Sequence, residues 1–149
     1  MSVNASEFVH TLSNDGKAVG FIPGGALDEV LQVWKSAHGG KGVLRVRLPY
    51  RPGRKDRQLA AALLEALEQP ELTRGISTAR AWERIARRCQ DRGCLLVVIE
   101  NADLLDRHSL AYAHRGYLPG VLLVGGERLA QQIAREAAYA GHILEWGIA

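Results

Sequence analysis

The chain has 149 residues, a formal net charge of +3 and a pI near 9.1. This length fits one domain, which can bury about two-thirds of its unfolded surface. The mildly basic charge permits contact with nucleic acid or an acidic protein and argues for neither. No apolar run approaches the length of a membrane span, and the start, MSVNASEF, lacks the basic and apolar regions of a secretory signal. We therefore expect a cytoplasmic protein.

Hydrophobic periodicity predicts alternating strands and helices after a lead-in, residues 1–16, which holds one helical turn around Phe8 and Leu12. Short apolar runs predict strands at 18–22, 43–48, 94–99, 121–124 and 142–146. Apolar residues at helical spacing predict helices, the third of them capped by Ser77, at 26–37, 58–68, 78–90, 102–114 and 127–140. Because strands that alternate with helices pair in parallel, we expect residues 17–149 to form one three-layer α/β/α domain with a mainly parallel, five-stranded sheet.

The turn after the first predicted strand can be compared with a phosphate loop, G-x-x-x-x-G-K-[ST], which lies between a strand and a helix. The stretch GFIPGGAL keeps both template glycines, Gly20 and Gly25, and has a further glycine, Gly24, beside the second. Ala26 stands where the lysine should reach the phosphate oxygens, and Leu27 stands where a hydroxyl should bind Mg²⁺. An ordinary glycine turn fits the same residues equally well, so we expect no tight nucleotide binding here.

The stretch LLVVIENADLL, Leu95–Leu105, has the outline of a Walker B strand. Its apolar part is long enough for a strand buried on both faces, which would bring Glu100 and Asn101 to the sheet edge where α/β proteins bind their ligands. A phosphohydrolase needs Asp and then Glu at these positions, because the first carboxylate holds Mg²⁺ and the second orients the attacking water. Here Glu100 lengthens the first side chain, and Asn101 replaces the second charge by a neutral amide.

A family resemblance rests on three stretches that occur in matching order: VLRVRLPY followed by RQLAAALLEALEQP, then LLVVIENADLL, then VLLVGGERLAQQI. Over residues 17–146 the chain resembles the AAA+ ATPases of the transposition-regulator type, which include the phage Mu B protein, the TniB group and the ExeA-like secretion ATPases. The resemblance implies a P-loop NTPase-like fold, and a polar sensor residue at the position of Gly126. We expect no helical lid domain, because the chain ends just after its last predicted strand.

Five departures from the family pattern remove nucleotide chemistry, at Ala26, Leu27, Glu100, Asn101 and Gly126. We therefore expect a catalytically inactive AAA+-like domain that uses no cofactor and no metal ion. It would act as a binding or regulatory module, encoded by a phage or mobile element, on a related ATPase, a transposase or another host protein. A homodimer is the simpler assembly.

Two other functions remain open. One is a DNA-binding accessory protein of transposition or recombination, because one predicted strand and its following loop, 49–57, carry the cations Arg45, Arg47, Arg51, Arg54, Lys55 and Arg57. Only Tyr50 interleaves there as an aromatic residue, so a solvated basic edge explains the cations better. The other is an NTPase with unusual ligands, Glu100, Asp103 and Asp28, which ranks lowest because no cation accompanies them near the phosphates.

Other residues of reactive or aromatic type are expected to be structural, because none has partners at the spacing of a metal or catalytic site: Lys41, Cys89, Cys94, His108, His114, Ser109, Trp34 and Trp82. The two cysteines are expected to be reduced. Tyr139 and Trp146 are candidates for an exposed apolar patch that meets a partner.

Overall fold

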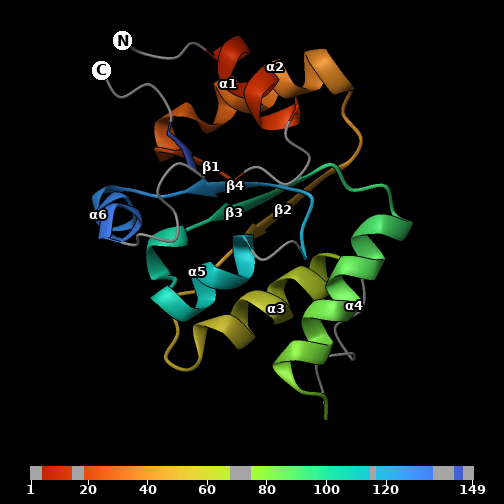
Figure 1. Ribbon diagram of the computed structural model, residues 1–149, viewed down its shortest axis with the longest axis vertical. Helices are drawn as coiled ribbons and strands as arrows, with labels where there is room; N and C mark the ends of the chain where they lie inside the picture. Colours follow the sequence, from red (N-terminus) through yellow and green to blue (C-terminus); the bar gives the residue numbers. More distant parts are fainter. Residues whose placement is uncertain (1–4, 15–18, 68–74, 115–116, 136–142, 146–149) are drawn as a thin grey trace.

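The computed structural model of the chain describes residues 5–14, 19–67, 75–114, 117–135 and 143–145 (Figure 1). Its helices are α1 (Ala5–Asn14), α2 (Leu27–His38), α3 (Lys55–Ala66), α4 (Thr78–Asp91), α5 (Arg107–His114) and α6 (Glu127–Arg135). Its strands are β1 (Val19–Ile22), β2 (Val43–Arg47), β3 (Leu96–Glu100), β4 (Gly120–Val124) and β5 (Ile143–Glu145). Two short 3-10 turns, η1 (Gly24–Ala26) and η3 (Ala102–Leu104), follow β1 and β3.

The sheet has the strand order β2-β3-β4-β1-β5, and each neighbouring pair is parallel. Leu122 in β4 lies opposite Val98 of β3 on one side and opposite Gly20 of β1 on the other. Because all the strands run the same way, their C-terminal ends meet at one edge. The α/β class with a parallel sheet, expected from the alternation of strands and helices, is confirmed.

Helices cover both faces of the sheet (Figure 1). On one face α1 and α2 pack together over a core that includes Phe8, Leu12, Val30, Val98 and Leu122. The apolar residues of both helices recur at helical spacing, which is why each presents one stripe to the sheet.

The opposite face of the sheet carries the larger hydrophobic core and is covered by α3, α4, α5 and α6 (Figure 1). Leu63, Trp82 and Leu129 pack there against Val97 and Ile99 of the central strand β3. Trp82 stacks on Tyr112 with ring centroids 5.0 Å apart. Alternate residues of β1, β3 and β4 therefore pack into the two cores, which makes the layered arrangement α/β/α.

Three helices differ from their predicted bounds. Residues 5–14 form a full helix instead of a single turn, because Phe8 and Leu12 both enter the core. The helix predicted at 102–114 divides into η3 and α5, since Leu105 is extended with ψ 136° and Asp106 accepts a hydrogen bond from the Ser109 amide at 2.8 Å. Helix α3 begins at Lys55 and not at residue 58, and buried Asp56 lies in its first turn.

The expected core roles of several residues are also found. Trp34 and Trp82 are buried, and Cys89 and Cys94 are both free thiols. Burial and the neighbouring Cys94 raise the pKa of the Cys89 thiol to about 12. Residues 136–142 and 146–149, which include Tyr139, Trp146 and the end of the last predicted helix, lie outside the described residues, as does the side chain of His114. Among the described helices none is long and apolar enough to cross a membrane.

Candidate functional site

The strand order brings the three predicted nucleotide segments to one edge of the sheet. Strands β3, β4 and β1 are neighbours, with Ile99 opposite Leu123 and Ile22 opposite Val124. The turn after β1, the residues after β3 and the glycines after β4 therefore lie at the C-terminal edge, where α/β folds bind ligands. We call this region, made of residues 23–28, 100–103 and 125–126, the C-terminal edge.

The turn after β1 is too tight to resemble an open phosphate loop. Pro23 alone separates β1 from η1, and the Ala26 amide donates to the Pro23 carbonyl at 3.0 Å. Gly24 and Gly25 are exposed and have open space around them. A phosphate loop needs several consecutive amides that face the ligand before the helix begins. Here the chain turns directly from strand into helix.

Gly20, expected as the first template glycine, lies before this turn. It lies inside β1, where a Cβ atom would come 2.8 Å from Cζ of Phe8 and 3.3 Å from Leu122. A glycine is needed here because α1 packs closely on the sheet. Helix packing therefore accounts for the glycine at this position.

Ala26 and Leu27, the positions of the expected lysine and hydroxyl, face the core beneath α1 and α2. Both are buried, with 7% and 4% of their surface exposed. Asp28, in the first turn of α2, is exposed. A lysine or threonine at 26 or 27 would enter an apolar core, so these two substitutions suit the packing of the helix.

Glu100, at the end of β3, is held by Arg45 of the adjacent strand β2. Arg45 Nε lies 3.0 Å from Glu100 Oε2, and one guanidinium NH₂ group lies 3.3 Å from Oε1. The hydrogen bond to Glu100 is the main cause that raises the pKa of Arg45. The side chains are 48% and 22% exposed, so the pair contributes less than about 1 kcal/mol to stability. It nevertheless engages both oxygens of the carboxylate that the resemblance places beside Mg²⁺.

Asn101 has a structural role that the Walker B comparison did not suggest. Its backbone is left-handed, with φ 58° and ψ 35°, a conformation that Asn tolerates better than most residues. Its Nδ2 donates to the Leu48 carbonyl at 3.0 Å, and the Leu48 amide donates to the Glu100 carbonyl at 3.1 Å. The amide side chain thus ties the chain leaving β2 to the end of β3.

Asp103 binds the chain that follows β4. Its Oδ2 accepts from the Gly126 amide at 2.8 Å, and its Oδ1 accepts from the Leu129 amide at 2.7 Å, so the carboxylate caps the N-terminus of α6. A Cβ at Gly125 would meet Leu129 Cδ2 at 2.8 Å and Asp103 Oδ1 at 3.0 Å. Sequence reasoning missed this cap, although a signal existed: the Gly-Gly pair before α6 offers the helix no capping side chain of its own.

No metal site is evident at this edge. Within the described ranges no group of three or more His, Cys, Asp or Glu side chains could hold an ion. Glu100 and Asp103, proposed with Asp28 as unusual nucleotide ligands, already bind Arg45 and the start of α6. Ser109 is fully buried and its hydroxyl donates to Asp106 at 2.7 Å, so it too has a capping role.

Several cations of the predicted basic patch contact other residues of the chain. Arg54 lies 2.8 Å from the carboxylate of buried Asp56, which also meets His108 at 3.5 Å. Arg57 donates to the Ile76 carbonyl at 3.1 Å. Lys55 lies against two partners, the Arg51 carbonyl and Gln58.

Two of the six cations, Arg47 and Arg51, have no contact of this kind among the described residues. Together with Arg45, the contacts above engage four of them within the structure. Arg47 and Arg51 are exposed, and their side chains form no ion pair with the residues that the structure describes. Tyr50, between them in sequence, is 82% exposed.

Comparison with models of known protein families, and with curated proteins, finds no match to this chain.

Proposed function

We propose that this chain is a P-loop NTPase-like domain of the AAA+ kind that does not turn over nucleotide and acts as a binding or regulatory module through contact with another protein. The observation that carries the proposal is the Arg45–Glu100 pair, in which both carboxylate oxygens at the Walker B position are bound by a neighbouring guanidinium. Phosphoryl transfer relies on a magnesium ligand at this position and on a cation near the phosphates.

The other groups at the C-terminal edge support the same proposal. The expected cation and hydroxyl positions, Ala26 and Leu27, are buried, and the turn before them leaves only Pro23 outside regular structure. Asp103 occupies the helix terminus where the family would place a sensor. The scaffold that would hold a nucleotide thus has its polar groups satisfied by the protein itself.

The partner is proposed on the resemblance. AAA+ domains assemble side by side around the nucleotide cleft, so an inactive copy can dock on an active ATPase and deprive it of a competent neighbour. A related ATPase, a transposase or another host protein of a phage or mobile element is the proposed target, and a homodimer is the simpler alternative. Light scattering of the chain alone and after mixing with a purified candidate ATPase distinguishes these assemblies.

Nucleotide binding is tested with a fluorescent ATP analogue, in the presence and absence of Mg²⁺, together with an assay of phosphate release. We expect no saturable magnesium-dependent binding and no turnover above the buffer rate. The variant Arg45→Ala, which releases Glu100, is compared with Arg47→Ala on the same strand. A hydrolysis rate that Glu100→Ala abolishes would overturn the proposal.

A second candidate function, binding of single-stranded DNA, is favoured by one observation. Exposed Tyr50 can stack on a base while Arg47 and Arg51 contact phosphates. Fluorescence anisotropy with a labelled oligonucleotide tests it. Binding that weakens steeply with salt and is lost in Tyr50→Ala and Arg51→Ala supports DNA, whereas unchanged anisotropy rejects it.

A further inference from the structure

Two cysteines lie on either side of the turn that ends α4. Cys89 is in the last turn of the helix, and Cys94 lies shortly before β3. The Cys94 amide donates to the Cys89 carbonyl at 2.9 Å, and the Gly93 amide donates to the Gln90 carbonyl at 3.1 Å. With Gly93 at φ 67°, these bonds form a Schellman motif, in which the side chains of the first and last residues are often in contact. Here both of those residues are cysteines.

The two thiols are in contact across this turn. Cys94 packs against the core that contains Cys89, and the two side chains are hydrogen-bonded. Standard bond lengths and the 2.9 Å hydrogen bond limit the distance between their Cα atoms to about 6.8 Å, and disulfides form at roughly 4.4–6.8 Å. Both are free thiols in this structure. A disulfide between them would therefore close a turn that backbone hydrogen bonds already hold.

The two thiols differ in their access to solvent. Cys89 is 2% exposed, whereas Cys94 is partly exposed. Burial, followed by the charge of Cys94 and the hydrogen bond with it, raises the pKa of the Cys89 thiol to about 12, so this thiol stays protonated at neutral pH. Because a thiolate is the nucleophile in disulfide exchange, a reagent in solution reacts first at Cys94. Cys89 then meets a sulfur that is already bonded to Cys94.

We propose that Cys89 and Cys94 are a site of reversible disulfide formation, which a small disulfide such as oxidised glutathione enters through Cys94. The Cys94 thiolate attacks one sulfur of the reagent, which gives a mixed disulfide and releases one glutathione. The Cys89 thiol loses its proton to solvent, and its sulfur attacks the Cys94 sulfur and expels the second glutathione. The two protein thiols lose two electrons, and the reagent is reduced to two thiols. The new bond ties the end of α4 to the chain that enters β3.

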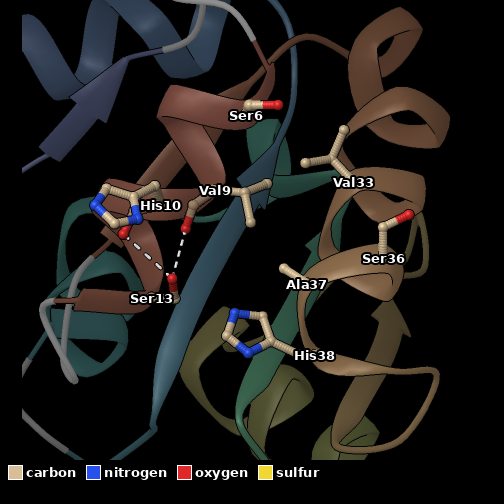
Figure 2. Close-up of a pocket in the computed structure, with 8 residues that line it drawn as sticks. All are labelled: Ser6, Val9, His10, Ser13, Val33, Ser36, Ala37 and His38. Atoms are coloured by element: carbon tan, nitrogen blue, oxygen red, sulfur yellow. Dashed lines mark hydrogen bonds between the residues drawn. The ribbon is translucent and has the colours of Figure 1, made fainter.

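The disulfide would act at the N-terminal edge of the sheet, opposite the C-terminal edge. Leu95, the residue after Cys94, lines a cavity of about 170 Å³ together with Trp34. This cavity adjoins the groove between α1 and α2 that Figure 2 shows, because Ser13 and His38 line both. The redox state of the pair should therefore change this edge. It takes no part in the proposed function.

The test equilibrates the folded chain in an oxidising glutathione buffer and measures its mass after acid quenching. We expect the wild type to lose about 2 Da, the mass of two hydrogens, and to keep no glutathione. Cys89→Ala should stop at an adduct that is about 305 Da heavier, because no second thiol expels the glutathione. Cys94→Ala should stay unmodified while folded, because Cys89 is buried. If Cys89→Ala does not fold, the wild type and Cys94→Ala still decide the question.

Two further measurements show whether the fold positions the pair. The equilibrium constant for the internal disulfide should be about tenfold or more greater in the folded chain than in urea, because the Schellman motif holds the two sulfurs together. In methyl spectra the signals of Leu95 should shift on oxidation. Val33 is the internal control, because it lies on α2 and lines only the groove (Figure 2), so its signals should not shift.

Four results would overturn the proposal. The first is a wild type that stays unmodified or stops at a glutathione adduct. The second is a disulfide that joins two copies of the chain, seen as a doubled mass. The third is an internal disulfide that is no more favoured in the folded chain than in urea. The fourth is a shift of Val33 as large as that of Leu95, which would show a general change of the fold. None of these results depends on whether the chain binds nucleotide.

Discussion

The polar side chains discussed at one edge of the sheet are hydrogen-bonded, whereas a buried one at the other edge is not. At the C-terminal edge Glu100, Asn101 and Asp103 are all paired with groups of the same chain. At the N-terminal edge, under the groove between α1 and α2, the indole of Trp34 is buried and unpaired. A buried polar group without a partner needs an explanation, whereas a satisfied one already has a structural role.

The strand order and glycine turns place the expected nucleotide segments together, but internal contacts engage their side chains. Leaving a buried donor unpaired costs free energy, whereas the paired groups at the C-terminal edge contribute to stability.

The largest effect is expected at Phe8. Its ring is fully buried between α1 and the sheet and lies against Gly20. Phe8→Ala should lower the free energy of unfolding by about 3–5 kcal/mol, because it removes a large apolar side chain and leaves a cavity. Urea denaturation measures the loss, with exposed Thr11→Ala on the same helix as the control. A loss below about 1 kcal/mol would show that α1 does not contribute to the core.

The contact between Phe8 and Gly20 can be tested by a double-mutant cycle. Gly20→Ala places a methyl group 2.8 Å from the Phe8 ring and should cost about 1–3 kcal/mol. In a Phe8→Leu background the same change should cost less, because the ring is gone. Strictly additive free energies would show that Gly20 is a glycine for another reason.

At the C-terminal edge, Asp103 should matter most for stability. Asp103→Ala removes two charge-assisted hydrogen bonds from the start of α6, so we expect a loss of about 2 kcal/mol. Asp103→Asn keeps one acceptor oxygen, so its free energy of unfolding should lie between those of the wild type and Asp103→Ala. Chemical denaturation of the three proteins checks this order. Equal stabilities would show that Asp103 does not stabilise the protein by capping α6.

Asp106 provides a smaller and pH-dependent effect. Burial opposes its ionisation, but hydrogen bonds from the Ser109 hydroxyl and amide outweigh burial and lower its pKa. A lowered folded pKa means that the cap contributes fully above the unfolded value of about 3.9 and is lost as pH falls through the folded pKa. Asp106→Ala should therefore cost about 1 kcal/mol at pH 7.

The cost of Asp106→Ala should therefore depend on pH. The difference in unfolding free energy between wild type and variant should shrink as pH falls below about 4, where the unfolded carboxyl takes up its proton. Thermal melts from pH 7 to pH 2 measure it. A difference that grows in acid would contradict the lowered pKa.

The sequence predicted the fold class and the positions of its segments better than the use of their side chains. The apolar run 96–99 and the helical spacing in α2 and α4 depend on burial alone, so they could be predicted from the local sequence. The roles of Asp103 and Arg45 could not, because each meets a partner far along the chain, at Gly126 and Glu100. The packing role of Gly20 could not be predicted for the same reason, since its constraint is the ring of Phe8.

The smallest effect on stability is expected at the pair that carries the proposed function. Arg45→Ala breaks a partly exposed ion pair, so the free energy of unfolding should fall by less than about 1 kcal/mol. Arg47→Ala, an exposed arginine on the same strand, controls for the loss of a positive charge. The informative measurement is binding of ATP in the presence of magnesium, followed by calorimetry, because Arg45→Ala leaves the Glu100 carboxylate without its guanidinium partner. If Arg45→Ala gains magnesium-dependent nucleotide binding and Arg47→Ala does not, the Arg45–Glu100 pair is what prevents nucleotide binding. If neither variant binds nucleotide, the short turn at Pro23 is sufficient to prevent binding.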